Sequence, residues 1–160
     1  MDKDTDDPIR EFVASGGDFR EWRPSYNIAP TDLVPVVREW EHDHTVTREV
    51  DGATWHLVPA WAAEAKVGAR RPAPINARLE TVTTNGMFRT AFTSRRCIVP
   101  MAGYYEWEDL PDGKQPHVIH GDGLLAAAGV YAGRQEDGGT WSHSMAVITR
   151  EARDASRRHP

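Results

Sequence analysis

Apolar and polar positions alternate in short runs along this chain, a pattern typical of β-strands with one buried face. The run Leu33–Trp40 is apolar and β-branched and predicts a first strand, which ends at the polar turn 41–44. The runs 45–50 and 53–58 flank Asp51-Gly52, a two-residue turn signal, and are predicted to form a hairpin. Strands joined by such short turns favour an antiparallel sheet.

The second half of the chain predicts more strands than helices. Strand-like segments lie at 97–100, 103–107, 117–120, 124–131 and 144–149, with a turn at 111–114. Helical segments are predicted at 6–14, 60–65, in part of 76–92, and from Arg150 onward. The threonines around Val82 weaken the third of these helices, because β-branched residues have low helix propensity.

These elements predict a single α+β domain over residues 1–160, with a twisted, mostly antiparallel, barrel-like sheet core and short flanking helices. A chain of 160 residues that is 39% hydrophobic has the size of one ordinary domain. No apolar run approaches 18 residues and the start is acidic, which predicts a cytoplasmic protein without a membrane segment. The one cysteine, Cys97, lies in an apolar strand and is expected to be a buried packing residue.

The charge of the chain is unevenly distributed, although the net charge of −5 argues against a generally basic nucleic-acid binder. Between Lys66 and Arg96 there are seven basic residues and one acidic residue, Glu80, a balance of +6, so the remainder carries −11. Such segregation is compatible with one positive groove for a phosphate backbone on an acidic body. A solvated basic face without a partner is the alternative.

The most informative segments are short motifs that occur in a fixed order. They are Tyr26-Asn27-Ile28-Ala29-Pro30-Thr31, Trp55 to Ala62, Ile75-Asn76-Ala77-Arg78-Leu79-Glu80-Thr81, and Arg95 to Pro100 running into Gly103-Tyr104-Tyr105-Glu106-Trp107. Lys114-Gln115-Pro116 and Ala128-Gly129-Val130-Tyr131 extend the series. Together these blocks resemble the SOS response-associated peptidase (SRAP) family over residues 26–149. The resemblance implies a protein that binds single-stranded DNA and attaches itself covalently to abasic sites.

In that family the nucleophile is a cysteine directly after the initiator methionine. Its α-amine and thiol together capture the aldehyde of an abasic site as a thiazolidine, which suits an amine with a pKa of about 8. Here position 2 is Asp2, which has no thiol, so the chain is expected to be inactive in crosslinking. Met1 is interpreted as an internal methionine downstream of a Cys-Gly-Arg-Phe opening, and the family's C-terminal third is expected to be absent as well.

The resemblance assigns catalytic positions to Asn76, Glu106 and His159. Asn76 and Arg78 are separated by one residue, so in an extended backbone both can face one ligand while Ala77 packs behind. Glu106 lies between two aromatic residues, and desolvation there would raise the pKa of its carboxyl toward the range of a general acid. A surface arginine in a turn and an exposed strand glutamate are the ordinary alternatives.

His159 matches the family histidine that assists ring opening, although its interval from Thr149 is one residue shorter than in the family and Arg158 precedes it. The resemblance further implies that six residues contact DNA. They are Asn27, Pro30, Trp61, Arg78, Arg89 and Thr149. Trp61 would stack on unstacked bases, whereas a core position is its alternative.

The resemblance therefore implies a pocket on which Asn76, Arg78 and Glu106 converge, in a monomer that needs no metal and no cofactor and associates with the nucleoid during DNA damage. No spacing of histidines or of Cys97 matches a metal site. A non-catalytic DNA-binding remnant of the family is a second hypothesis. A small-molecule hydrolase that uses Glu106 with a histidine is a third, but the sequence supplies no nucleophile for it.

Overall fold

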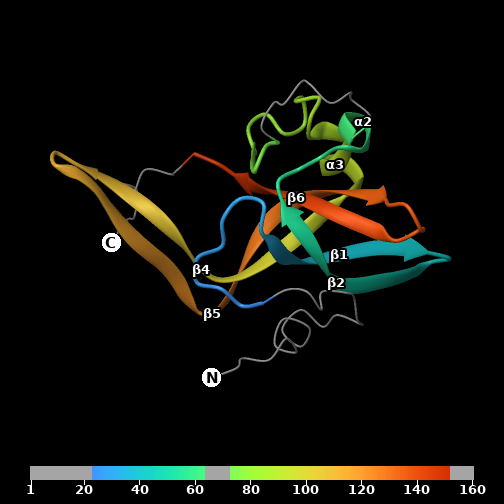
Figure 1. Ribbon diagram of the computed structural model, residues 1–160, viewed down its shortest axis with the longest axis horizontal. Helices are drawn as coiled ribbons and strands as arrows, with labels where there is room; N and C mark the ends of the chain where they lie inside the picture. The colour runs from blue at the N-terminus through green and yellow to red at the C-terminus, as the bar shows by residue number, and fades with distance from the viewer. Residues whose placement is uncertain (1–22, 64–72, 152–160) are drawn as a thin grey trace.

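The computed structural model describes residues 23–63 and 73–151 (Figure 1). Most of these residues lie in strands. The strands are β1 (Leu33–His42), β2 (Thr45–Trp55), β3 (Asn76–Arg78), β4 (Arg96–Leu110), β5 (Gly113–Gln135) and β6 (Trp141–Thr149). Two short helices, α2 (Ala60–Ala63) and α3 (Arg89–Ser94), lie beside the sheet.

The sheet curls into a ring. Its strand order is β2-β1-β4-β5-β6-β3, and a further pairing between β2 and β6 joins the first five strands into a closed circuit. The edge of β6 that faces away from β5 is shared, since Thr54 and Trp55 of β2 pair with its first half and β3 pairs with its second half. Both of these pairings are parallel and the others are antiparallel. The predicted α+β fold with a mostly antiparallel sheet is confirmed.

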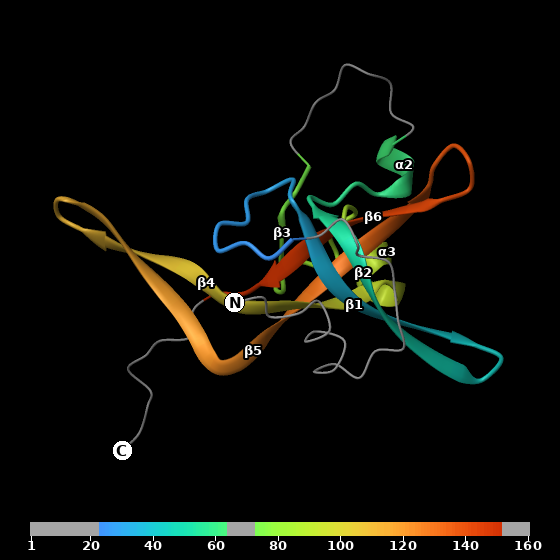
Figure 2. The same ribbon diagram turned by 60° about the horizontal axis from the view of Figure 1, so that its bottom comes forward.

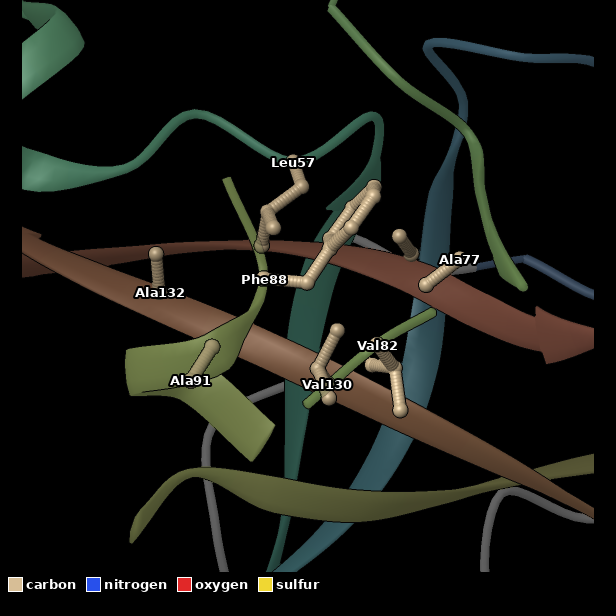
Figure 3. Packing of buried hydrophobic residues seen from close by; sticks show 8 residues of the cluster. Leu57, Ala77, Val82, Phe88, Ala91, Val130 and Ala132 are labelled. Carbon is tan, nitrogen blue, oxygen red and sulfur yellow. The ribbon is translucent and has the colours of Figure 1, made fainter. Parts of the chain in front are cut away.

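Alternation along β5 and β6 supplies two hydrophobic cores, one on each face of these strands. Tyr131 and Met145 face the inside of the ring, where they pack with Val36 and other residues of β1, β2 and β4. Val130 and Ala146 face the opposite way, toward the helices. Figure 3 shows this second cluster, whose members are Leu57, Ala77, Val82, Phe88, Ala91, Val130, Ala132 and Ala146. The buried Cys97 belongs to the inner core, as predicted.

The outer halves of β4 and β5 form a long hairpin that projects from the ring (Figures 1 and 2). The two strands stay paired from Gly103↔His120 to Leu110↔Gly113. Its large apolar side chains are exposed, with 52% of Tyr105 and 58% of Trp107 accessible. We refer to residues 103–120 as the arm.

The predicted hairpin turn at Asp51-Gly52 is wrong. β2 runs straight through these residues, which pair with Val36 and Pro35 of β1. The turn of this hairpin lies at Asp43 and His44, whose φ angles of +48° and +61° place both in the left-handed region. Asp51 stays in the strand because it is buried and bonded to Arg38, an interaction that its local sequence does not reveal.

Other boundaries also differ from the predictions. The segment 76–92 was expected to be partly helical, but it begins as β3, continues in turns, and becomes α3 only at Arg89. The predicted strands 97–100 and 103–107 are one strand, β4, and those at 117–120 and 124–131 belong to β5. The expected helices at 6–14 and beyond Arg150 lie outside the described residues, as does the end of the one at 60–65. Neither described helix has the length or apolar content that a membrane crossing requires.

Candidate functional site

β3 presents two polar side chains beside the end of β6. In this strand Ala77 is fully buried, while Asn76 and Arg78 are exposed on either side of it. The parallel register places Asn76 next to Val147 and Arg78 next to Thr149. The orientation predicted from the alternation of these three residues is confirmed, because Ala77 packs in the outer core.

The C-terminal end of β6 and the residues after it are hydrogen-bonded to the residues that follow β3. The amide of Leu79 donates to the carbonyl oxygen of Thr149 at 2.8 Å, and the amide of Glu151 donates to Oε1 of Glu80 at 3.1 Å. Hydrogen bonds from its own amide and from that of Glu151, helped by the positive charges of Arg78 and Arg150, lower the pKa of the Glu80 carboxyl. Glu80 is therefore an ionised group that orders this corner of the molecule.

The loop that carries Asn27 and Pro30 is anchored to the same region through Trp55. The amide of Thr31 donates to the Trp55 carbonyl oxygen at 3.0 Å, and the Trp55 indole Nε1 donates to the carbonyl oxygen of Ile75 at 3.0 Å. Ile75 directly precedes Asn76 in the sequence. Asn27 and Pro30 are both exposed, so this loop forms an accessible rim near the start of β3.

The arm meets this loop at one hydrogen bond. The hydroxyl of Tyr105 donates to the carbonyl oxygen of Tyr26 at 3.2 Å. Figures 1 and 2 both show the loop, drawn in blue, beside the part of β4 from which the arm departs. Tyr26 and Tyr105 were not singled out as site residues, and only the presence of both in the ordered motifs could have drawn attention to them.

Glu106 lies on the arm and differs from its prediction. It is exposed and pairs across the hairpin with His117, so the desolvation expected for a general acid is absent. The physical reason is that the arm stands clear of the two hydrophobic cores, and its neighbours Tyr105 and Trp107 are themselves more than half exposed. In the described part of the chain, no hydrogen bond or ion pair joins Glu106 to Asn76 or Arg78.

The structure therefore assembles part of the predicted site. Asn76, Arg78 and Thr149 are neighbours on β3 and β6, and the loop with Asn27 and Pro30 is bonded to the residue before them. Glu106 is connected only indirectly, through the bond of Tyr105 to Tyr26. His159 lies outside the described residues, as do three of the seven basic residues between Lys66 and Arg96. Those three are Lys66, Arg70 and Arg71.

Trp61 and Arg89 lie on the two helices. Trp61 is 60% exposed on α2, which rules out the core position that was its alternative. Arg89 is the first residue of α3 and is exposed. Arg95 and Arg96 are exposed as well, so every described member of the basic group presents its side chain to solvent.

A cavity of about 360 Å³ lies beside Thr149 and has an almost wholly apolar lining. Leu79, Phe92 and Ile148 contribute to its walls, together with Arg96 and Arg150. Cys97 also lines it, and burial raises the pKa of this thiol to about 12, so the thiol is not a nucleophile at neutral pH. Within the described ranges, no group of three or more His, Cys, Asp or Glu side chains is placed to hold a metal ion.

Residues 2–159 match the family model of the SOS response associated peptidase (SRAP). The chain is 32% identical over 145 residues to the abasic site processing protein YoqW of Bacillus subtilis, covering 88% of this chain and 59% of the relative. It is 27% identical over 158 residues to the abasic site processing protein HMCES of Xenopus tropicalis, covering 83% and 47%. The chain thus spans less than two thirds of the length of these relatives.

Solved structures share the fold. A crystal structure of a protein from Bacteroides thetaiotaomicron superposes with a TM-score of 0.59 at 28% identity, covering 76% of this chain and 51% of that one. Another, from Bordetella bronchiseptica, gives a TM-score of 0.69 at 21% identity and covers 97% of this chain and 72% of that one. The fold of this chain is therefore shared with experimentally determined proteins.

Proposed function

Because the chain belongs to the SOS response associated peptidase (SRAP) family, we propose that it takes part in abasic-site processing by binding single-stranded DNA. The binding face consists of β3, the end of β6 and the loop 26–31. The observation that carries this proposal is the exposure of Asn76 and Arg78 on one short strand, next to Thr149 and to the loop anchored by Trp55. The names of the relatives YoqW and HMCES point to the same damaged substrate.

The proposed contacts follow from the chemistry of the exposed groups. Arg78 and Arg89 bind phosphates, for which the guanidinium fork is suited. Asn27, Pro30 and Thr149 line the path of the strand, and Trp61 supplies an exposed ring on which an unstacked base can lie. The partner is DNA with an abasic site, and the protein acts as a monomer in the cytoplasm, at the nucleoid when DNA is damaged.

The proposed chemistry at the abasic site begins with opening of the sugar to an aldehyde, while Asn76 orients the reacting carbon. His159 assists this step together with Glu106, which approaches from the arm where Tyr105 bonds to Tyr26. In family members that carry a cysteine at position 2, exposed by methionine removal, this cysteine then condenses through its α-amine with the aldehyde and releases water. Its thiol adds to the resulting imine carbon, and the imine nitrogen takes up the proton, which closes a thiazolidine. Asp2 stands at this position here and supplies no thiol.

Non-catalytic binding of single-stranded DNA is the second candidate, favoured by the observation that position 2 is Asp2. Incubation with an abasic single-stranded oligonucleotide distinguishes covalent crosslinking from non-catalytic binding. Only crosslinking gives a heat-stable adduct on a denaturing gel. We expect the chain to bind the oligonucleotide without forming such an adduct. A variant that carries Cys-Gly-Arg-Phe after the initiator methionine should form one.

A matched control keeps this test interpretable. Asn76→Ala in the cysteine-bearing variant should reduce the adduct while retaining the fold, since Asn76 is exposed and contributes nothing to either core. The proposal would be overturned if neither the original chain nor the cysteine-bearing variant bound the oligonucleotide, with each shown by circular dichroism to be folded.

A further inference from the structure

A second cavity lies at the other end of β6, away from the proposed DNA-binding face. It measures about 340 Å³ and is lined by Arg38, Arg95, Tyr131, Gly133, Trp141 and His143. Its two β6 residues, Trp141 and His143, lie eight and six positions before Thr149, which is roughly 26 and 20 Å along the strand at about 3.3 Å per residue. This cavity therefore belongs to neither the proposed site nor the apolar cavity beside it.

Aromatic rings form much of its wall. The rings of Tyr131 and His143 meet edge to face, with centroids 5.8 Å apart, and Trp141 is 63% exposed at the rim. Gly133 pairs with His143 across the strands, and a Cβ atom on this glycine would lie 3.3 Å from Trp141 and 3.4 Å from His143. The absence of a side chain at Gly133 thus lets the rings of Trp141 and His143 pack against the backbone of β5.

The charges around the cavity differ in their availability. The guanidinium of Arg38 is bonded to Asp51, lies 3.8 Å from the carboxylate of Glu49, and stacks on Trp40 at 4.5 Å from the ring centroid. Its charge is therefore compensated within the protein. Arg95 is exposed, and among residues 23–63 and 73–151 no hydrogen bond or ion pair engages its guanidinium. The amide of Tyr131 donates to the Arg95 carbonyl oxygen at 2.9 Å and fixes its backbone beside the cavity.

The histidine on this wall is half-buried, and its surroundings favour the neutral imidazole. Burial is the main cause that lowers the pKa of His143, and the positive charge of Arg38 adds to it, while Asp51 opposes it. A neutral imidazole is a flat surface with one donor and one acceptor, which suits contact with a planar ring. The cavity thus combines flat aromatic walls with one available cation.

We propose that this cavity binds one nucleotide unit, with its base against Trp141 and His143 and its phosphate on Arg95. The volume lies at the lower end of the range of about 300–1,000 Å³ for small-molecule sites, which matches a single nucleotide. A free inorganic anion would leave the rings unused, and a nucleoside would leave Arg95 unused. The unit is either a free nucleoside monophosphate or one residue of a DNA strand, since both offer the same base and phosphate.

The test compares three probes by isothermal titration calorimetry: deoxyadenosine monophosphate, deoxyadenosine and inorganic phosphate. We expect the nucleotide to bind about tenfold more tightly than the nucleoside, because the charge-assisted contact with Arg95 is present only in the former. Arg95→Gln should abolish that difference, and Trp141→Ala should weaken both nucleotide and nucleoside.

A control variant makes the outcome specific to this cavity. Arg134→Gln alters the adjacent residue of β5, whose guanidinium is already paired with Glu136, and should leave nucleotide affinity unchanged. Equal affinity for nucleotide and inorganic phosphate, or an unchanged affinity in Arg95→Gln, would overturn the proposal. A short intact oligonucleotide that competes with the nucleotide identifies a strand as the source, and lack of competition identifies the free nucleotide. The adduct assay with abasic DNA is independent of this titration, so the two proposals fail separately.

Discussion

Arg78 lies directly opposite Thr149 in the parallel pairing of β3 with β6, and the amide of Leu79 closes the pair by donating to the Thr149 carbonyl oxygen at 2.8 Å. β3 can pair with β6 here because β2 pairs only with Ser144 and Met145, in the first half of the edge of β6 that faces away from β5. A three-residue strand can then enter beside the second half. The ring topology thus brings an arginine and a threonine that are 71 positions apart to one exposed edge.

Replacement of Arg78 by glutamine tests the contribution of this edge to DNA binding. The slope of log affinity against log salt concentration for a single-stranded oligonucleotide should become shallower by about 0.7, the value for loss of one phosphate contact. Fluorescence anisotropy at four or more salt concentrations measures it. Arg134→Gln is the matched control, because Arg134 lies at the other end of the sheet in an ion pair with Glu136. An unchanged slope in Arg78→Gln would remove Arg78 from the interface.

Local alternation was enough to predict how β3 presents its side chains. The pattern of Asn76, Ala77 and Arg78 gave the correct buried residue and the correct exposed pair. It could not reveal that the strand pairs with β6, because the partner lies some 70 residues further along the chain. The family resemblance grouped Asn76 with Thr149, but the register that joins them comes from the closure of the ring.

The wrong predictions also have a common physical cause, which is that local sequence does not report burial by distant residues. Asp51-Gly52 has the composition of a turn, yet Arg38 of β1 holds Asp51 in a strand. Glu106 sits between aromatic residues, a pattern that favours a buried site, yet the hairpin that carries it leaves the ring and all three residues are exposed.

Removal of the Asp51 carboxylate should destabilise the ring. Asp51→Ala leaves the partly buried guanidinium of Arg38 with only the longer contact to Glu49, and loss of one member of such a buried pair costs about 3 kcal/mol of the free energy of unfolding. Urea denaturation followed by circular dichroism measures this change. Lys114→Gln removes an exposed pair with Asp109 and should cost less than about 0.5 kcal/mol. Equal effects of the two variants would show that burial of the Arg38–Asp51 pair is unimportant.

Gly103 is required at the base of the arm by a close backbone approach. A Cβ atom there would lie 2.7 Å from the carbonyl oxygen of Ile119 in the paired strand, closer than non-bonded atoms tolerate. Gly103→Ala should therefore lower the free energy of unfolding by about 1–3 kcal/mol. Gly123→Ala is the control, since a Cβ atom at that glycine of β5 meets nothing within 4 Å. Thermal melting of both variants measures the difference. An equal fall of the two melting midpoints would show that the close approach at Gly103 is unimportant.

Cys97 should be inert toward thiol reagents in the folded protein. Its side chain packs in the inner core, and burial raises the pKa of the thiol to about 12, so almost none is thiolate at pH 7. Reaction of the thiol with 5,5′-dithiobis(2-nitrobenzoic acid) should be slow in buffer, whereas in concentrated denaturant it should be complete within minutes. Gly129→Ala, which would bring a Cβ atom to 2.9 Å from the Cys97 sulfur, should accelerate the reaction by loosening this contact. Rapid labelling of the native parent chain would refute the buried assignment.

Acidification should weaken the hydrogen bond between Glu80 and the Glu151 amide at the C-terminal end of β6, because it protonates the Glu80 carboxylate. Hydrogen bonds from its own amide and from that of Glu151, with the charges of Arg78 and Arg150, lower the pKa of this carboxyl below its ordinary value of 4.5. A carboxyl with a lowered folded-state pKa stabilises the folded state above its unfolded-state pKa, and the contribution disappears as the pH falls through the folded-state value. Protonation of Glu80 weakens the hydrogen bond from the Glu151 amide. The NMR chemical shift of this amide proton should therefore change in a transition below pH 4.5.

Glu80→Gln should remove that transition because the amide no longer titrates. Glu136→Gln provides the control, since the pKa of Glu136 is also lowered, by Ser142 and Arg134, but at the opposite end of β6. Its substitution should leave the titration of the Glu151 amide in place. A Glu151 transition that persists in Glu80→Gln would show that another carboxyl orders this corner, and the proposed DNA-binding edge would then not depend on Glu80.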